Sequence, residues 1–272
     1  MLNGKRLVIT GVATEDSIAT ATARAAVGSG ARVALTAFPR DLDAARAIAT
    51  DLGADVRVHP LDLCDPEATD AVGHAIVDDL GGLDGALHAV AFSPAAALSG
   101  DFLAADAAAT ELAFRTSAWS LTNLARMFRE HAGPGGALVG LDFDAGDRAW
   151  PVYNWMGVCK AALRSSVTYL ARDLGPIGIR VNLVAAGPLH TRAANGIPDF
   201  HRLTDAWATT APLAWSTTDP TPVAETVCFL LSDHSRAITG EVLHVDGGYH
   251  AMAAPLPLDG TRVHTTGTSG IS

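Results

Sequence analysis

The chain has little of what marks disulfide-bonded, metal-binding or nucleic-acid-binding proteins. Its 272 residues include three widely spaced cysteines in apolar surroundings, so we expect reduced core thiols rather than a disulfide framework at Cys64, Cys159 and Cys228. With 19 basic against 29 acidic residues, a net charge of −10 and no basic cluster, a nucleic-acid partner is not expected.

Long apolar runs and metal-ligand patterns are also missing. No stretch reaches the roughly 18 apolar residues of a membrane span, and the opening residues MLNGKRLVIT lead directly into a strand-like run without a signal peptide. We therefore expect a cytoplasmic protein that has no membrane segment. The histidines show no metal-ligand spacing and are expected to be surface or hydrogen-bonded residues: His88, His190, His201, His244 and His250.

Aromatic residues make up 6% and charged residues 18% of the chain, whereas 26 glycines are present. Small side chains suit helices that pack closely on a parallel sheet. Short aliphatic runs predict seven strands, at 6–10, 32–36, 56–61, 85–90, 136–141, 179–184 and 241–246. Helical spacing predicts helices at 17–28, 41–52, 66–80, 106–131, 152–174 and 221–232. This alternation predicts an α/β fold, a Rossmann-type doubly wound sheet of seven parallel strands with helices on both faces.

We expect residues 1–252 to form a single domain, with two segments outside the strand–helix rhythm. Residues 188–220 follow the sixth strand and mix Pro, Gly and Thr with aromatic residues, as substrate loops of such sheets do. Trp207 and Trp215 in this insertion either face a substrate or anchor the loop. Residues 253–272 form a polar C-terminal tail, for which we expect weak local structure.

The turn after the first strand, TGVATEDSIA at 10–19, lacks the Gly-x-Gly-x-x-Gly dinucleotide fingerprint. Gly11 still allows a tight turn, and Ser17 with Ile18 opens a helix whose positive N-terminus could hold a pyrophosphate. The same residues fit an ordinary capped helix. This stretch alone therefore leaves both interpretations open.

Tyr153 and Lys160 lie seven positions apart in AWPVYNWMGVCKAALRS, residues 149–165. Seven residues bring an α-helix back to within about 20° and advance it by about 10 Å, so both side chains share a face. They could hold two ends of one ligand laid along the helix. A partly buried tyrosine and a surface lysine at the same spacing are the simpler alternative.

Five motifs occur in order: GVATEDSIA at 11–19, LDFD at 141–144, YNWMGVCK at 153–160, NLVAAGPLHT at 182–191 and VDGG at 245–248. Together they resemble the NADH-dependent enoyl-acyl-carrier-protein reductases, a divergent branch of the short-chain dehydrogenase/reductase superfamily, and most of all the mycolate-pathway type. The resemblance covers residues 2–252, and its most specific element is the Tyr-x6-Lys spacing. Ordinary members of the superfamily place this pair four apart and add a serine from the fifth strand, which LDFD lacks.

The resemblance implies reduction of the trans-2 double bond of an enoyl thioester in fatty-acid-type biosynthesis, with acyl-carrier protein or coenzyme A as the carrier. Tyr153 would donate a hydrogen bond to the thioester oxygen. Lys160 would hold the nicotinamide ribose, and Phe143 would line the hydride path. Substrate contacts carried over in the same way fall on Tyr153, Phe92, Met156 and Trp215. Cofactor contacts fall on Gly11, Ser17, Ile18, Phe38, Asp62, Leu63, Val90, Ala91, Lys160, Leu189 and Thr191.

The end of the second strand, LTAFPR, favours NADH over NADPH. No acid takes the ribose hydroxyls there, and only one base, Arg40, could meet a 2′-phosphate. By resemblance, Phe38 would stack on the adenine. Ala89 and Ala91 stand where the family often has Ser and Gly, which alters the pocket shape slightly.

Two further features bear on the site and its substrate. Asp142 and Asp144 are expected to be solvated or to support the site from behind. The insertion at 192–215 looks shorter than in the long-chain mycolate enzymes, so we expect a preference for shorter or differently shaped acyl groups.

Two other functions stay open at this point. A carbonyl or imine reductase of specialised metabolism could use the same scaffold, although the missing serine argues against ordinary ketone reduction. A dinucleotide-sensing regulator is the second alternative, but such proteins tend to lose the Tyr or the Lys. The resemblance also implies a homotetramer.

Overall fold

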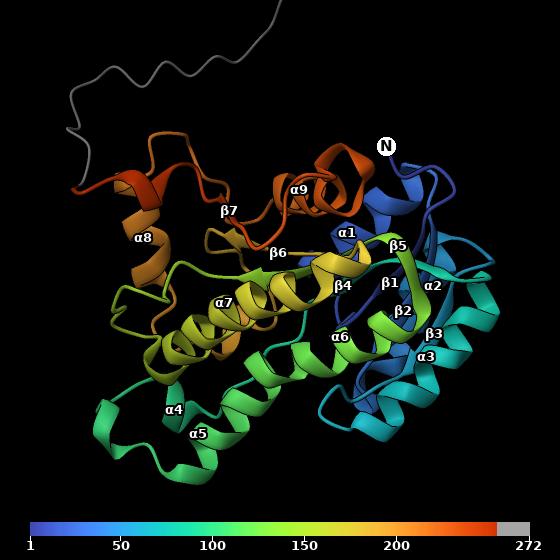
Figure 1. Ribbon diagram of the computed structural model, residues 1–272. Coiled ribbons are helices and arrows are strands. Elements are labelled where there is room, and N and C mark those ends of the chain that lie inside the picture. Colours follow the sequence, from blue (N-terminus) through green and yellow to red (C-terminus); the bar gives the residue numbers. More distant parts are fainter. Residues whose placement is uncertain (255–272) are drawn as a thin grey trace, which may run out of the picture.

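A seven-stranded parallel sheet forms the centre of the computed structural model, which describes residues 1–254 (Figure 1). The predicted polar tail lies almost entirely outside the described residues. The strands follow the order β3-β2-β1-β4-β5-β6-β7. Their bounds are β1 Arg6–Ile9, β2 Arg32–Ala37, β3 Arg57–Pro60, β4 Leu83–His88, β5 Ala132–Asp142, β6 Arg180–Ala186 and β7 Val242–Val245. The predicted fold class and all seven predicted strands are confirmed.

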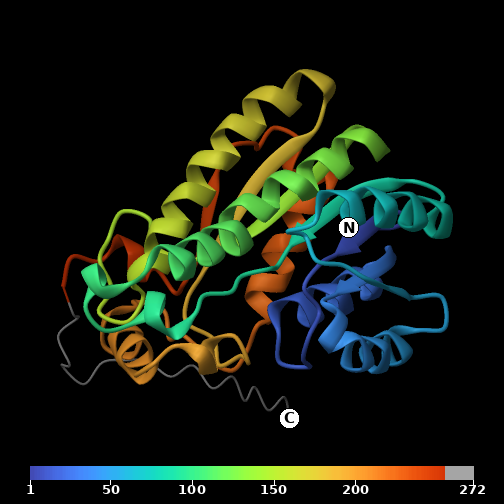
Figure 2. The same cartoon turned by 90° about the horizontal axis from the view of Figure 1, so that it is seen from below.

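Helices cover both faces of the sheet. They are α1 Ile18–Gly28, α2 Leu42–Leu52, α3 Pro66–Leu80, α4 Ala95–Leu98, α5 Ala107–Phe114, α6 Ser120–His131, α7 Asn154–Leu174, α8 His201–Thr210 and α9 Thr221–Leu231. One apolar core lies between the sheet and α1, α2 and α9, and a second lies between the sheet and α3, α6 and α7. Figures 1 and 2 show α6 and α7 running side by side. The alanine-rich face of α1, with Ala19, Ala23 and Ala26 buried, lets this helix approach the sheet closely.

The helix predicted over 106–131 is divided. A π-helical turn, Arg115–Trp119, separates α5 from α6. Within this turn, the Ser117 hydroxyl accepts from the Phe92 N–H at 3.0 Å and donates to the Phe92 carbonyl at 2.9 Å. The turn therefore fixes the loop that follows β4, and such turns are frequent at functional sites.

Two short helices were not predicted. They are α4, after β4, and α8, inside the predicted substrate-loop insertion. Both lie at the same end of the molecule in Figures 1 and 2. The first is only four residues long and the second ten, and both have Pro and Gly close by, so no helical period stands out.

The order of the strands determines where a ligand can bind. From β1 the chain proceeds outward to β2 and β3, and then crosses to β4 on the other side of β1. Loops after β1 and β4 consequently diverge and leave a crevice at the carboxyl ends of the strands. No helix within residues 1–254 is long and apolar enough to cross a membrane.

Arg180, at the start of β6, fixes the C-terminal end of α9. Its guanidinium is largely buried and donates to the carbonyls of Leu230 and Ser232 at 2.8 and 3.1 Å, and to the Ser235 hydroxyl at 2.8 Å. Helix ends leave carbonyls without intrahelical partners. Arg180 satisfies them and thereby joins α9 to the sheet.

We expect Arg180→Met to lower the free energy of unfolding by roughly 2–4 kcal/mol, because it leaves these acceptors buried without a charged donor. Urea denaturation of the two proteins measures the difference. Arg172→Met, which changes an exposed arginine at the end of α7, is the control and should leave the midpoint unchanged. Equal losses in the two variants would contradict this role of Arg180.

Candidate active site

A cavity of about 720 Å³ opens at the carboxyl ends of the strands. Segments that follow β1 to β6 line it, together with the start of α7. All of the predicted site residues except Trp215 are on its lining, namely Gly11, Ser17, Ile18, Phe38, Asp62, Leu63, Val90, Ala91, Phe92, Phe143, Tyr153, Met156, Lys160, Leu189 and Thr191. The structure thus brings together residues from most of the length of the chain.

Tyr153 and Lys160 both line this cavity and both are buried, at 8% and 6% exposed. The helix begins two residues later than predicted, so Tyr153 is the residue before α7 and Lys160 lies about two turns inside it. The Lys160 ammonium donates to the Leu141 carbonyl at 2.8 Å, at the end of β5. The surface lysine of the simpler interpretation is therefore wrong.

Burial controls the protonation of this pair. It raises the pKa of the Tyr153 phenol above its ordinary value, so the hydroxyl stays protonated and available as a donor. Burial also lowers the pKa of the Lys160 ammonium, an effect that the charge of Asp142 opposes. A neutral phenol and an ammonium next to a carboxylate suit hydrogen-bond donation rather than proton abstraction.

Asp142 and Asp144 are buried, so of the two expectations the solvated one is wrong, and the structure agrees with the one in which they support the site. Arg164 on α7 explains how they stay inside: its Nε donates to Asp142 Oδ2 at 2.6 Å, and its Nη2 donates to Asp144 Oδ1 at 3.2 Å. Burial raises the pKa of Asp142, although Lys160 and Arg164 oppose it. A hydrogen bond from His244, with help from Arg164, lowers the pKa of Asp144 to about 2. The two carboxylates hold the turn at the end of β5 rather than face the cavity as a pair.

Phe143, between these carboxylates, is fixed by aromatic packing. Its ring centroid lies 4.9 Å from that of Tyr153 and 5.5 Å from that of Trp207. Trp207 in turn stacks on Tyr249 at 3.9 Å, and its indole donates to the Asp246 carbonyl at 3.0 Å. Of the two interpretations of Trp207, the structure supports the loop anchor.

Trp215 does not line the cavity, so the predicted substrate contact is corrected. Its indole donates to the Pro188 carbonyl at 2.9 Å. A Cβ on Gly187 would lie 2.6 Å from the Trp215 ring, which shows how closely the ring packs against that backbone. Trp215 fixes the chain just after β6 from behind.

The turn after β1 is tight and leaves no room for a side chain at Gly11. Gly11 has a φ of +74°, and a Cβ there would lie 2.2 Å from the Ala89 carbonyl oxygen, so no other residue fits. The Ser17 hydroxyl accepts from the Thr20 N–H at 3.1 Å and caps α1, as in an ordinary capped helix. Ser17 and Ile18 nevertheless line the cavity, so the positive end of α1 meets it.

Some lining residues were missed or wrongly placed by the sequence analysis. Cys64 is not a core thiol: it is half-buried on the lining, with its sulfur 3.7 Å from the Thr116 hydroxyl, and burial raises its pKa. Asp41 is an acid close to the end of β2, where none was expected, and Arg192 joins it from the segment after β6. The sequence signal for Asp41 was its place four residues after a strand end.

His88, the last residue of β4, is a hydrogen-bonded residue as expected. It is fully buried, and its Nε2 lies 2.8 Å from the Ser120 hydroxyl. Ser120 donates to the Thr116 carbonyl at 2.6 Å, so it accepts from His88. Burial, with a contribution from the charge of Lys160, lowers the pKa of His88 from 6.5 to about 3.

The pKa of His88 predicts a pH-dependent stability. In the unfolded chain His88 takes up a proton below about pH 6.5, whereas in the folded protein it stays neutral until about pH 3. The contribution of the neutral His88 to the free energy of unfolding is therefore fully present above pH 6.5 and is lost as the pH falls toward 3. As the pH falls from about 6 to about 4, the free energy of unfolding should decrease more steeply in the wild-type protein than in His88→Gln. The two slopes should differ by about 1.4 kcal/mol per pH unit. Urea denaturation across this range measures it, and parallel curves would contradict it.

Comparison with known proteins agrees with this arrangement. A family model described as enoyl-(acyl carrier protein) reductase matches residues 11–250. The NADH enoyl-[acyl-carrier-protein] reductase of Mycolicibacterium smegmatis is 38% identical over 262 residues, which covers 91% of this chain and 97% of the relative. The NADH enoyl-[acyl-carrier-protein] reductase of Bacillus cereus is 39% identical and covers 93% of this chain and 99% of the relative. That of Escherichia coli is 37% identical and covers 93% of this chain and 96% of the relative. The chain belongs to the enoyl-(acyl carrier protein) reductase family.

Proposed function

We propose that this protein is an NADH-dependent reductase that reduces the trans-2 double bond of an enoyl thioester in fatty-acid biosynthesis, with acyl-carrier protein as the carrier. The observation that carries the proposal is the pairing of Tyr153 and Lys160, both buried and both on the lining of one cavity beside the Gly11 turn. The names of the relatives support the same reaction and the same cofactor.

The residues present fit a nicotinamide dinucleotide. The cavity of about 720 Å³ extends from Phe38, after β2, to Tyr153 and Met156 at α7. Gly11 lets the turn after β1 pass close to the Ala89 carbonyl, and the positive N-terminal end of α1 lies at Ser17 and Ile18 on the lining, where it suits a pyrophosphate.

For residues on this lining, the family resemblance implies individual contacts. Phe38, Asp62 and Leu63 would contact the adenine. Val90 and Ala91 would lie near the adenosine ribose and the nicotinamide, and Leu189 and Thr191 near the carboxamide and phosphate. Lys160 would reach the nicotinamide ribose.

When bound, NADH supplies the hydride that adds to C3 of the enoyl thioester. Negative charge then develops on the thioester oxygen, where the protonated Tyr153 hydroxyl donates a hydrogen bond, and a proton from water adds to C2 to give the saturated thioester. One such preorganised donor contributes about 3 kcal/mol to barrier lowering. Lys160 positions the ribose, and its hydrogen bond to the Leu141 carbonyl fixes its own location. Phe143 excludes water from the path, and Phe92 and Met156 contact the acyl chain.

NADH oxidation with a series of trans-2-enoyl thioesters tests the proposal. Tyr153→Phe should lower kcat by roughly 100-fold and leave NADH affinity nearly unchanged, because it removes one hydrogen bond to the developing charge. Lys160→Ala should mainly weaken NADH binding, measured by titration without substrate. We expect turnover to favour shorter or differently shaped acyl groups, because the 192–215 insertion looks shorter than in the long-chain mycolate enzymes.

Other outcomes would point elsewhere. Tight NADH binding without turnover of any enoyl thioester would favour the carbonyl or imine reductase, tested with those substrates. Binding without turnover of any substrate would favour the dinucleotide sensor. Turnover that rises steadily to very long acyl chains would contradict the chain-length prediction. The cytoplasmic location stays a prediction from the sequence.

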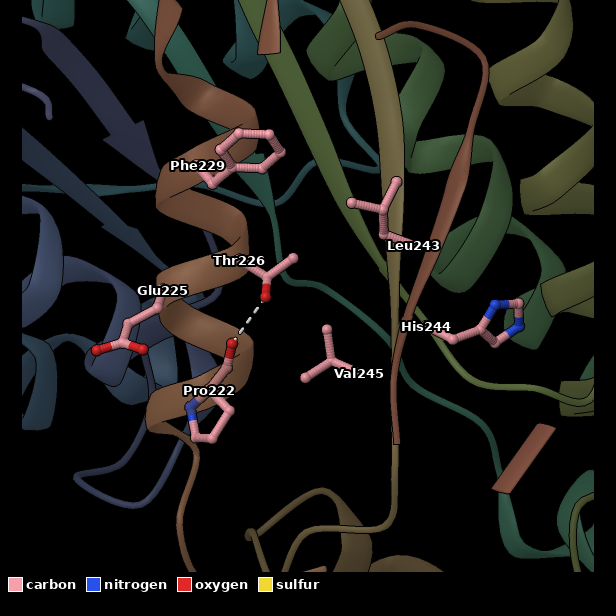
Figure 3. Close-up of a pocket in the computed structure, with 7 residues that line it drawn as sticks. All are labelled: Pro222, Glu225, Thr226, Phe229, Leu243, His244 and Val245. Atoms are coloured by element: carbon pink, nitrogen blue, oxygen red, sulfur yellow. Dashed lines mark hydrogen bonds between the residues drawn. The ribbon is translucent and has the colours of Figure 1, made fainter. Parts of the chain in front are cut away.

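We also propose a homotetramer, in which α9 and the edge strand β7 take part in a contact between subunits. Between them is an open groove of about 560 Å³, lined by Pro222, Glu225, Thr226, Phe229, Leu243, His244 and Val245 (Figure 3). Among the described residues, β7 pairs with β6 alone. An edge strand beside apolar side chains suits coverage by a second copy.

Light scattering should give about four times the chain mass of 28.0 kDa. Thr226→Arg places a charge in the groove and should yield smaller species, whereas Thr50→Arg, on the exposed face of α2, should not. A monomeric wild-type protein, or a tetramer that Thr226→Arg leaves intact, would contradict the proposed contact.

A further inference from the structure

An acidic residue lies at the end of the cavity where β2 finishes. A short 3-10 helix, Pro39–Asp41, follows β2 and turns the chain back toward the cavity. Phe38, Arg40 and Asp41 all line it. The side chain of Asp41 is only 9% exposed, whereas that of Arg40 is 65% exposed. A carboxylate this deeply buried requires charged partners.

Two arginines partner this single carboxylate. Arg192 Nη2 lies 2.7 Å from Asp41 Oδ1, although the two residues are 151 positions apart in the sequence. Arg40 Nε lies 3.6 Å from Asp41 Oδ2. Each carboxylate oxygen therefore faces one guanidinium. Both arginines are half-exposed or more and both line the cavity, so without Asp41 they would present two uncompensated positive charges to a bound molecule.

NADH and NADPH differ only at the adenosine ribose. NADPH carries a 2′-phosphate on the adenosine ribose, with about two negative charges, and the ribose lies beyond the end of the second strand in this fold class. Arginine binds phosphate well through its planar donors. A cavity with Arg40 and Arg192 free would thus suit NADPH.

We propose that Asp41 makes this protein select NADH over NADPH. The inference rests on the proposed function, since it concerns the same cofactor site. Asp41 acts in two ways: it forms ion pairs with Arg40 and Arg192 and so offsets their charge, and its own charge repels a 2′-phosphate. Asp41 is thus a specificity residue that acts on the cofactor through charge, and the two arginines are the groups that it neutralises.

Titration of NADH and NADPH without acyl substrate, followed by nucleotide fluorescence, tests this directly. Asp41→Asn keeps the shape and removes the charge. We expect the ratio of the NADPH to the NADH dissociation constant to fall by about tenfold, which is within the range for one unit charge a few ångströms from another. Asp41→Ser should shift the ratio in the same direction, and it provides the test if the Asn variant folds poorly.

Asp43→Asn is the matched control. Asp43 follows two residues later, is fully exposed and pairs with Arg46 at 3.3 Å, and it is not on the cavity lining. Its removal changes net charge equally and should leave the ratio unchanged. In the Asp41→Asn background, Arg40→Gln with Arg192→Gln should abolish the gain in NADPH affinity, because the two guanidinium groups at this end of the cavity are then removed.

Several results would overturn the inference. An unchanged ratio in both Asp41 variants, with NADH still bound, would refute it and leave the proposed function standing. Persistence of the gain after both arginines are replaced would also refute it, because the effect would then arise from shape. Failure of the wild-type protein to bind either dinucleotide would instead refute the proposed function.

Discussion

The attachment of α7 to the end of β5 is the constraint on which the site depends. Two cationic side chains on one face of α7, four residues apart, make it: Lys160 bonds to the Leu141 carbonyl at 2.8 Å and Arg164 bonds to Asp142 at 2.6 Å. Residues at this spacing are neighbours on a helix. With these contacts in place, Tyr153 at the start of α7 and Phe143 after β5 meet at 4.9 Å.

This attachment also explains why charges are tolerated inside the protein. Asp142 and Asp144 lie between Lys160, Arg164 and Arg148, so each buried carboxylate has a cation within reach. A buried ion pair adds little net stability, but removal of one partner is costly. The network is therefore better understood as a device that keeps one geometry at the end of β5, which hydrogen-bond donation by Tyr153 requires.

Much of the fold and the centre of the site could be predicted from the sequence. Periodicity revealed the strands because most of them are aliphatic runs with buried side chains, and the spacing of Tyr153 and Lys160 identified a shared cavity lining. The directions of side chains in irregular segments could not be predicted. Trp215 was expected at the substrate and instead packs under Gly187, and Asp41 meets Arg192 across 151 positions. No local pattern encodes such contacts, because they depend on how separate loops fold over the sheet.

The central claim is that the cavity directs hydride to C3 of an enoyl thioester while Tyr153 holds the thioester oxygen. Its most direct test uses NADH that carries deuterium at the transferable position of C4. Mass spectrometry and NMR of the product then show which carbon received the deuterium. We expect a saturated acyl thioester with one deuterium at C3. A deuterium on a carbinol or amine carbon, or a product without deuterium, would contradict it.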